Sequence, residues 1–213
     1  MSYIAERRQE EKERRRAEIL DATEAVAAKV GWDALTMDQV ARKARLSRAL
    51  LYVYFKDKQD LLFGICERAL ATLRQRFAEA VGRQKRGLDQ IVAIGRAYIA
   101  FSQEFPVYFE VIARCEMVSP NPEENTNEGA ATSRGDEARQ LMVDALRTGV
   151  ADGSIRPDVG DVRLVSNTLW AFTHGVLQLA ATKANVLLHD GVTIKDFVEH
   201  ALVMATRSIE ARP

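Results

Sequence analysis

Residues 36–58 read TMDQVARKARLSRALLYVYFKDK. Thr36 and Ser47 are residue types that cap the N-termini of helices, so a short helix is expected over residues 37–44 and another from Ser47. The connection between them is only about three residues long. Two short helices joined by such a turn are typical of a helix-turn-helix.

The same stretch is locally basic. Residues 42–58 hold six Lys and Arg residues against Asp57 alone, a net charge of +5, although the 213-residue chain has a net charge of 0. Tyr52 and Tyr54 alternate with these cations, and a phenol can hydrogen-bond a phosphate while cations attract the DNA backbone. The pattern favours a DNA-binding surface. A solvated charged face with aromatic core residues remains the alternative, since helix pairs of this kind also occur in proteins that do not bind DNA.

The rest of the chain is predicted to be helical. Apolar residues recur every three to four positions, no alternating run is long enough for a sheet, and about nine helices are expected. The helices expected before and after the helix-turn-helix comprise residues 12–30, 57–80, 88–103, 106–117, 129–148, 162–183 and 193–212. We therefore expect an all-α protein. Residues 1–60 would form a three-helix helix-turn-helix domain with a charged N-terminal extension over 1–16, and residues 61–213 a larger helical domain.

Several function classes find little support. The two cysteines form no metal-ligand cluster or disulfide framework, and the three histidines occur without metal spacing. No nucleophile triad or glycine-rich phosphate loop is present, so neither a catalytic residue nor a metal or cofactor is expected, and a helical-bundle enzyme is a weak alternative. No signal peptide or membrane span is expected, which favours the cytoplasm.

Residues 19–62, ILDATEAVAAKVGWDALTMDQVARKARLSRALLYVYFKDKQDLL, resemble the tetracycline-repressor (TetR) family of bacterial transcription regulators. The matching positions are Ile19, Leu20, Ala22, Gly31, Trp32, Thr36, Val40, Ala41, Leu51, Tyr52, Tyr54, Phe55, Lys58 and Leu61. Residues 152–158 and 169–179 resemble the family only weakly. Many ordered matches over about 45 residues make the N-terminal resemblance specific.

The resemblance implies which residues contact DNA. Leu51 and Phe55 are expected to pack, while the helix opening at Thr36 braces a reading helix in the major groove. The implied contacts are Thr36, Met37, Ser47, Arg48, Ala49, Leu50, Tyr52, Val53, Tyr54 and Lys58. Two residues depart from the family pattern. Arg45 replaces a frequent glycine and would adopt a left-handed conformation costing about 1 kcal/mol, and Leu50 offers only apolar contact to a base.

The resemblance also implies a homodimer through the last two helices, binding double-stranded DNA at a palindromic operator. We expect a repressor released by a small, hydrophobic effector. Control by a partner protein is the alternative. Candidate effector contacts are Phe101, Phe105, Tyr108, Phe109, Ile112, Trp170, His174 and Leu177, although aromatic residues at helical spacing also suit an ordinary core.

Overall fold

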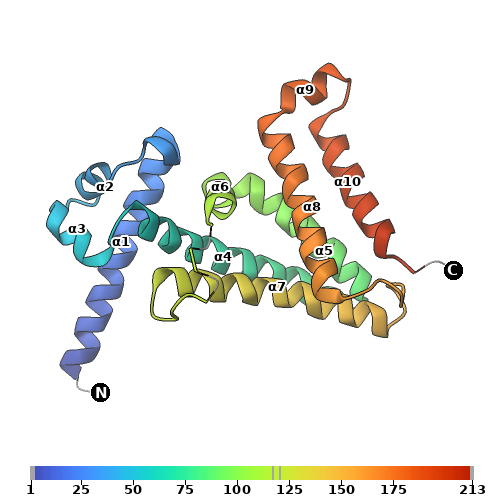
Figure 1. The fold of residues 1–213 in the computed structure, drawn as a ribbon, viewed down its shortest axis with the longest axis horizontal. Helices are drawn as coiled ribbons and strands as arrows, with labels where there is room; N and C mark the ends of the chain where they lie inside the picture. Colours follow the sequence, from blue (N-terminus) through green and yellow to red (C-terminus); the bar gives the residue numbers. More distant parts are fainter. Residues whose placement is uncertain (1–2, 117, 120, 212–213) are drawn as a thin grey trace. The chain divides into compact units, whose positions relative to one another are not determined.

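The computed structural model describes residues 3–116, 118–119 and 121–211, which contain ten helices and no strand (Figure 1). The helices are α1 (Tyr3–Ala34), α2 (Met37–Lys43), α3 (Arg48–Tyr54), α4 (Lys58–Gly82), α5 (Gly87–Glu104), α6 (Pro106–Arg114), α7 (Asn127–Ala151), α8 (Val162–Thr182), α9 (Ala184–His189) and α10 (Ile194–Ile209). The all-α prediction is confirmed. The expected helix ends at residues 117 and 212 lie outside the described residues. No helix of the described part is long and apolar enough to span a bilayer.

The chain forms two compact units. The first comprises residues 1–69 and 107–133, and the second residues 70–106 and 134–213. Helices α4 and α7 each contribute to both units. The expected functional division into residues 1–60 and 61–213 stays a prediction.

The first unit is organised by α1. This helix begins at Tyr3, nine residues earlier than expected, and Gly31 interrupts it with a φ of 77°. A glycine tolerates this left-handed conformation without the clash that a β-carbon would make. Helices α2 and α3 follow the interruption. The core of this unit contains fully buried aliphatic and aromatic side chains, among them Ile19, Leu20, Val40, Leu51 and Phe55.

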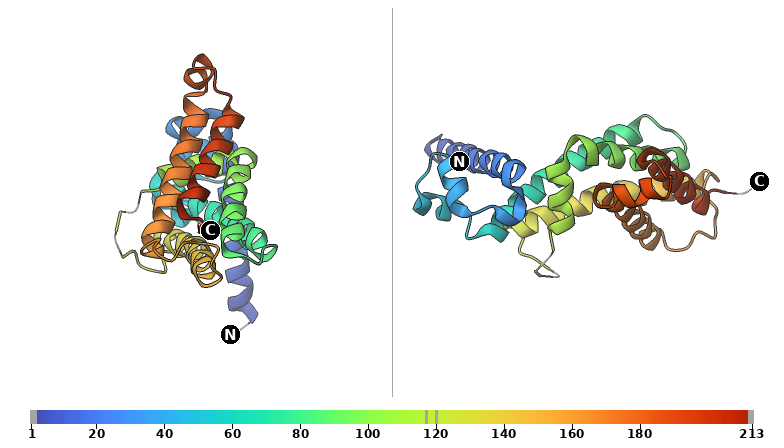
Figure 2. Two further views of the ribbon diagram at one scale, coloured as in Figure 1. Left: turned by 90° about the vertical axis from the view of Figure 1, so that its right-hand side faces the viewer. Right: turned by 90° about the horizontal axis from the view of Figure 1, so that it is seen from above.

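The second unit packs α5, α8 and α10 together. Helices α8 and α10 lie side by side and are joined at one end by the short helix α9, the one helix that was not expected (Figures 1 and 2). A β-carbon added at Gly87 would lie 2.0 Å from the backbone nitrogen of Gly149. The N-terminus of α5 and the C-terminal part of α7 therefore approach each other at backbone distance.

Candidate nucleic-acid interface

The two short helices α2 and α3 are both capped by hydroxyl side chains. The backbone N–H of Gln39 donates to Thr36 Oγ1 at 3.3 Å, and the backbone N–H of Thr36 donates to Gln39 Oε1 at 2.8 Å, which completes a capping box. The backbone N–H of Leu50 donates to Ser47 Oγ at 3.1 Å. The caps use hydroxyl oxygens as acceptors, so the hydroxyl protons of Thr36 and Ser47 stay available to phosphate.

The turn between α2 and α3 is a Schellman motif. The N–H of Leu46 donates to the carbonyl of Ala41 at 2.9 Å, and the N–H of Arg45 donates to the carbonyl of Arg42 at 3.2 Å. Arg45 has a φ of 57°. Among the described residues it is the only one other than glycine whose φ is positive. The expectation of a left-handed Arg45 is confirmed. Helix α3 consequently leaves the turn in a fixed direction.

Helix α3 buries one side and exposes the other. Leu51 and Phe55 are fully buried, as expected of packing residues, whereas 75% of Val53 and 41% of Tyr52 are exposed. Ser47, Arg48, Ala49 and Leu50 are also exposed, and Tyr54 is half-buried. Of the remaining predicted contacts, Met37 is buried, so only its backbone is presented at the start of α2.

Arg48 lies within a small cluster at the start of α3. Its Nε is 3.2 Å from Asp38 Oδ1, and its guanidinium lies 5.6 Å from the centre of the Tyr52 ring. The pKa of Arg48 is raised, first by its hydrogen bond to Tyr52 and then by the charge of Asp38. These contacts orient an exposed cation and an exposed phenol toward the same side of α3.

Lys58 begins α4 and reaches back to the end of α1. Its Nζ donates to the backbone carbonyl of Asp33 at 3.0 Å and lies 5.8 Å from the centre of the Trp32 ring. An ammonium group carries three donors, so two more protons can reach a phosphate. The geometry fixes the position of Lys58 and is compatible with the predicted backbone contact.

The remaining cations of the basic segment have no acidic partner. Among the described residues, none of four exposed side chains forms an ion pair, namely Arg42, Lys43, Arg45 and Lys56. Most arginines elsewhere in the described chain do pair with carboxylates, as Arg68 does with Asp21. Unpaired cations on and next to the helix-turn-helix leave a net positive surface there.

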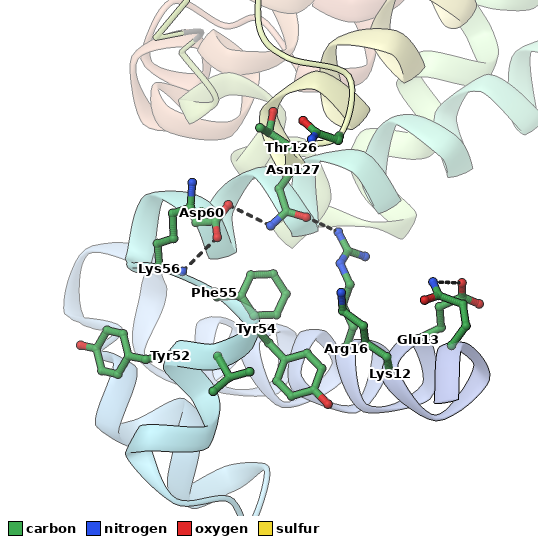
Figure 3. A pocket seen from close by; sticks show the side chains of 13 residues that line it. Lys12, Glu13, Arg16, Tyr52, Tyr54, Phe55, Lys56, Asp60, Thr126 and Asn127 are labelled. Carbon is green, nitrogen blue, oxygen red and sulfur yellow. Dashed lines mark hydrogen bonds between the residues drawn. The ribbon is translucent and has the colours of Figure 1, made fainter. Parts of the chain in front are cut away.

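A polar network that the sequence analysis did not predict holds the connection between α3 and α4. Arg16 Nη2 donates to Glu67 Oε2 at 2.9 Å. It also donates to Asn127 Oδ1 at 2.7 Å, and Asn127 Nδ2 donates to Asp60 Oδ1 at 2.8 Å (Figure 3). Asp60 Oδ2 accepts the backbone N–H of Lys56 at 3.0 Å. The network joins α1, the start of α4 and the first residue of α7. Sequence offered no signal for it, because its partners are up to 111 positions apart.

The predicted effector contacts of the second unit surround a hydrogen-bonded pair. The hydroxyl of Tyr98 lies 2.7 Å from His174 Nδ1, and Trp170 and Phe101 pack against these rings. Burial raises the pKa of Tyr98 to about 12 and lowers the pKa of His174. Trp170 also lines a cavity of about 40 Å³. This volume is close to that of one water molecule, so a larger ligand requires side chains to move.

The other predicted effector contacts divide between the two units. Phe105 packs on Phe101 with ring centres 5.5 Å apart, and Leu177 is buried in the second unit. In the first unit, the hydroxyl of Tyr108 donates to Glu24 Oε1 at 3.1 Å, and burial raises its pKa to about 12. Phe109 is buried there and Ile112 is half-buried. The structure thus gathers Phe101, Trp170 and His174 around Tyr98, with Phe105 packed on Phe101.

Two family models match most of the chain. The family model "Bacterial regulatory proteins, tetR family" matches residues 19–65. The model "Tetracyclin repressor-like, C-terminal domain" matches residues 91–204, more than half of the chain. The chain belongs to the TetR family. TetR-family proteins are DNA-binding transcription regulators rather than enzymes, which confirms the expected lack of an enzymatic function.

Individual known proteins are similar to this chain over most of its length. The transcriptional repressor KstR2 of Mycolicibacterium smegmatis is 27% identical over 161 residues, covering 73% of this chain and 76% of that protein. A Rhodococcus protein of unknown function has the same fold, with a TM-score of 0.73 and 24% identity over 92% of this chain and 95% of its own. FadR of Bacillus subtilis, solved with stearoyl-CoA, gives a TM-score of 0.67 at 16% identity, over 91% and 99% respectively.

Proposed function

We propose that this TetR-family chain is a repressor that binds a palindromic operator as a homodimer and is released by a small, hydrophobic effector. The observation that carries the DNA-binding part is the face of α3, where Tyr52 and Val53 are exposed. The exposed cations of α2, of the turn and of residue 56 form no ion pair among the described residues. A helix of this kind fits the major groove, while cations at its ends contact phosphates. Such a repressor binds DNA in the bacterial cytoplasm, where the chromosome lies.

Five of the predicted contacts have distinct parts in this proposal. Arg48 reads base edges from the start of α3, and Leu50 makes apolar contact with a thymine methyl group. Tyr52 and Lys58 contact phosphates and hold the register of the helix without reading sequence. Thr36 supplies a hydroxyl proton to the backbone at the start of α2. Residues 1–60 would serve as the DNA-binding domain and residues 61–213 as the sensing and dimerisation domain.

The apolar faces of α8 and α10 support a homodimer. Large apolar side chains on these two helices are exposed in the single chain, namely Leu164, Trp170, Phe172, Leu179, Val203 and Met204. An isologous contact would bury them against the same helices of a second copy. The two reading helices of the dimer must then lie about 34–36 Å apart, or a multiple of that distance, to reach both half-sites.

The effector site of the second unit is proposed around Tyr98, Trp170 and His174. The cavity beside them is lined mostly by apolar side chains, with the hydroxyl groups of Tyr98, Thr173 and Thr206 as its polar groups, and Tyr98 is hydrogen-bonded to His174. Such a lining suits a hydrophobic molecule with a polar group. The FadR complex with stearoyl-CoA shows that a protein of this fold holds a ligand with a long acyl chain. A ligand can favour a dimer in which the reading helices have a spacing that does not fit the operator. Such a ligand weakens DNA binding only as far as it binds this form of the dimer more tightly than the form that fits DNA.

Gel-shift titration with parallel sedimentation tests the DNA-binding face. Tyr52→Ala is expected to weaken operator binding while the dimer stays intact. Tyr52→Phe removes only the hydroxyl group, so it distinguishes the contribution of the hydroxyl to binding from that of the ring. The salt slope of binding is the slope of the logarithm of the binding constant against the logarithm of the salt concentration. Lys58→Ala is expected to lower the magnitude of this slope by about one unit, since one phosphate contact is lost. Unchanged affinity in both alanine variants would refute the assigned face.

Mass spectrometry of the natively purified protein tests the effector. A co-purifying hydrophobic compound that releases the chain from DNA is the expected result. A bound polypeptide in its place would support control by a partner protein and contradict the small-molecule proposal.

A further inference from the structure

A groove lies next to α3, between its C-terminal end and the N-terminal half of α1. It has a volume of about 380 Å³ and is lined by Gln9 and Lys12 of α1, by Val53 and Tyr54 of α3 and by Lys56, among others. Figure 3 shows Tyr52 and Tyr54 projecting to opposite sides of α3. All of its lining residues belong to the first compact unit. None of the effector candidates lines it.

Two cations of the groove have no ion-pair partner among the residues that the structure describes. Lys12 and Lys56 form no ion pair within the described part of the chain. The two carboxylates that line the groove already accept hydrogen bonds from other donors. Glu13 accepts from Gln9 Nε2 at 2.8 Å, and Asp60 accepts from the backbone of Lys56 and from Asn127. The two ammonium groups are therefore available to an anion outside the chain.

The groove is continuous with the exposed face of α3. Tyr52 and Val53 line the groove and are also exposed on that helix. A duplex in contact with α3 therefore passes directly beside Lys12 and Lys56. The anions nearest to these two side chains would be phosphates of the same duplex.

The N-terminal part of α1 has no core to hold it. Every side chain of residues 3–14 is exposed, and the segment is supported by local contacts such as Gln9–Glu13 and Glu11–Arg14. A helix of about twelve residues is marginally stable in water without tertiary contacts. Binding along a phosphate backbone would stabilise it.

We propose that the N-terminal part of α1, together with the groove it forms with the end of α3, binds the phosphate backbone of the DNA that flanks the base pairs read by α3. Lys12 and Lys56 are the phosphate contacts. This inference rests on the proposed function, because it assumes that α3 binds DNA. Residues 3–16 span about 20 Å along the helix axis, so the contact adds at most about six base pairs to each half-site.

The experiment compares Lys12→Gln with the matched control Lys29→Gln. Both lysines are exposed residues of α1 without an ion pair among the described residues, and they lie about 100° apart around the helix axis. Only Lys12 lines the groove. Both variants lose one charge without disturbing the core, which circular dichroism verifies.

Binding is measured on the shortest genomic fragment that the wild-type chain retains, and on the same fragment extended by about ten base pairs of random sequence at each end. Random flanks suffice because phosphate contacts carry no sequence information. The dissociation constant is measured at salt concentrations between about 50 and 200 mM. Over this range each phosphate contact contributes a factor of about 3.5 to the weakening of binding by salt, so a variant that lacks the contact weakens by that much less per half-site.

On the extended fragment, Lys12→Gln is expected to lower the salt slope by about one unit per half-site, and Lys29→Gln to leave it unchanged. Lys12→Arg should keep the wild-type slope. On the short fragment the three variants should bind alike. If the wild-type chain binds the extended fragment, but Lys12→Gln and Lys29→Gln have the same salt slope on it, the inference about α1 is wrong while the proposed function stands. Failure of the wild-type chain to bind any fragment would overturn the proposed function as well.

Discussion

Replacing Arg45 with glycine should make the first unit more stable. Arg45 holds a φ of 57° at the end of α2, a conformation that costs a residue with a β-carbon about 1–2 kcal/mol. Glycine avoids this cost but loses more backbone entropy on folding, about 0.5–1 kcal/mol. Arg45 is exposed and unpaired among the described residues, so few contacts are lost with its side chain. From the midpoints of these two ranges, Arg45→Gly should raise the free energy of unfolding by about 0.7 kcal/mol.

Urea unfolding followed by circular dichroism measures this gain. Arg45→Ala is the matched control, because it removes the same charge and keeps the left-handed β-carbon. Arg45→Ala should leave the unfolding midpoint near that of the wild-type chain. Equal stability of Arg45→Gly and Arg45→Ala would show that the turn is not strained, and would refute the reasoning from φ.

Three further predictions concern other positions. Thr36→Ala should destabilise the first unit by about 1 kcal/mol through loss of the capping box, measured by urea unfolding. Gly87→Ala should cost about 3 kcal/mol because its β-carbon meets the Gly149 backbone, whereas Gly82→Ala, with open space around it, should cost nothing. Burial lowers the pKa of His174, so the unfolded chain binds this proton more tightly and stability falls as the pH drops below 6.5. His174→Gln should lose less stability between about pH 7.5 and about pH 5.5 in the same assay.

The local features of the first unit were predictable from sequence. Thr36 and Ser47 act as caps because they lie directly before short apolar patterns. Gly31 interrupts α1 directly after residue 30, where the first helix was expected to end. The left-handed Arg45 followed from the family's glycine at that position. These features depend on neighbours within a few residues, which a single sequence displays.

The features that escaped prediction depend on longer distances or on weak patterns. Helix α9 has six residues and none of them is buried, so it left no apolar periodicity. The Arg16–Asn127 and Tyr98–His174 hydrogen bonds join residues 111 and 76 positions apart, and no local pattern indicates such pairs. The N-terminal extension of α1 carries charges on all sides, which concealed its helical character.

Selection of bound fragments from genomic DNA by the full chain tests the central claim most directly. The claim is that a homodimer presents two α3 helices to the major groove of one operator. It predicts enriched palindromic fragments whose half-site centres lie about 10–10.5 base pairs apart, or a multiple of that spacing. Recovery of fragments without a shared palindrome, at affinities no better than those for random DNA, would contradict it.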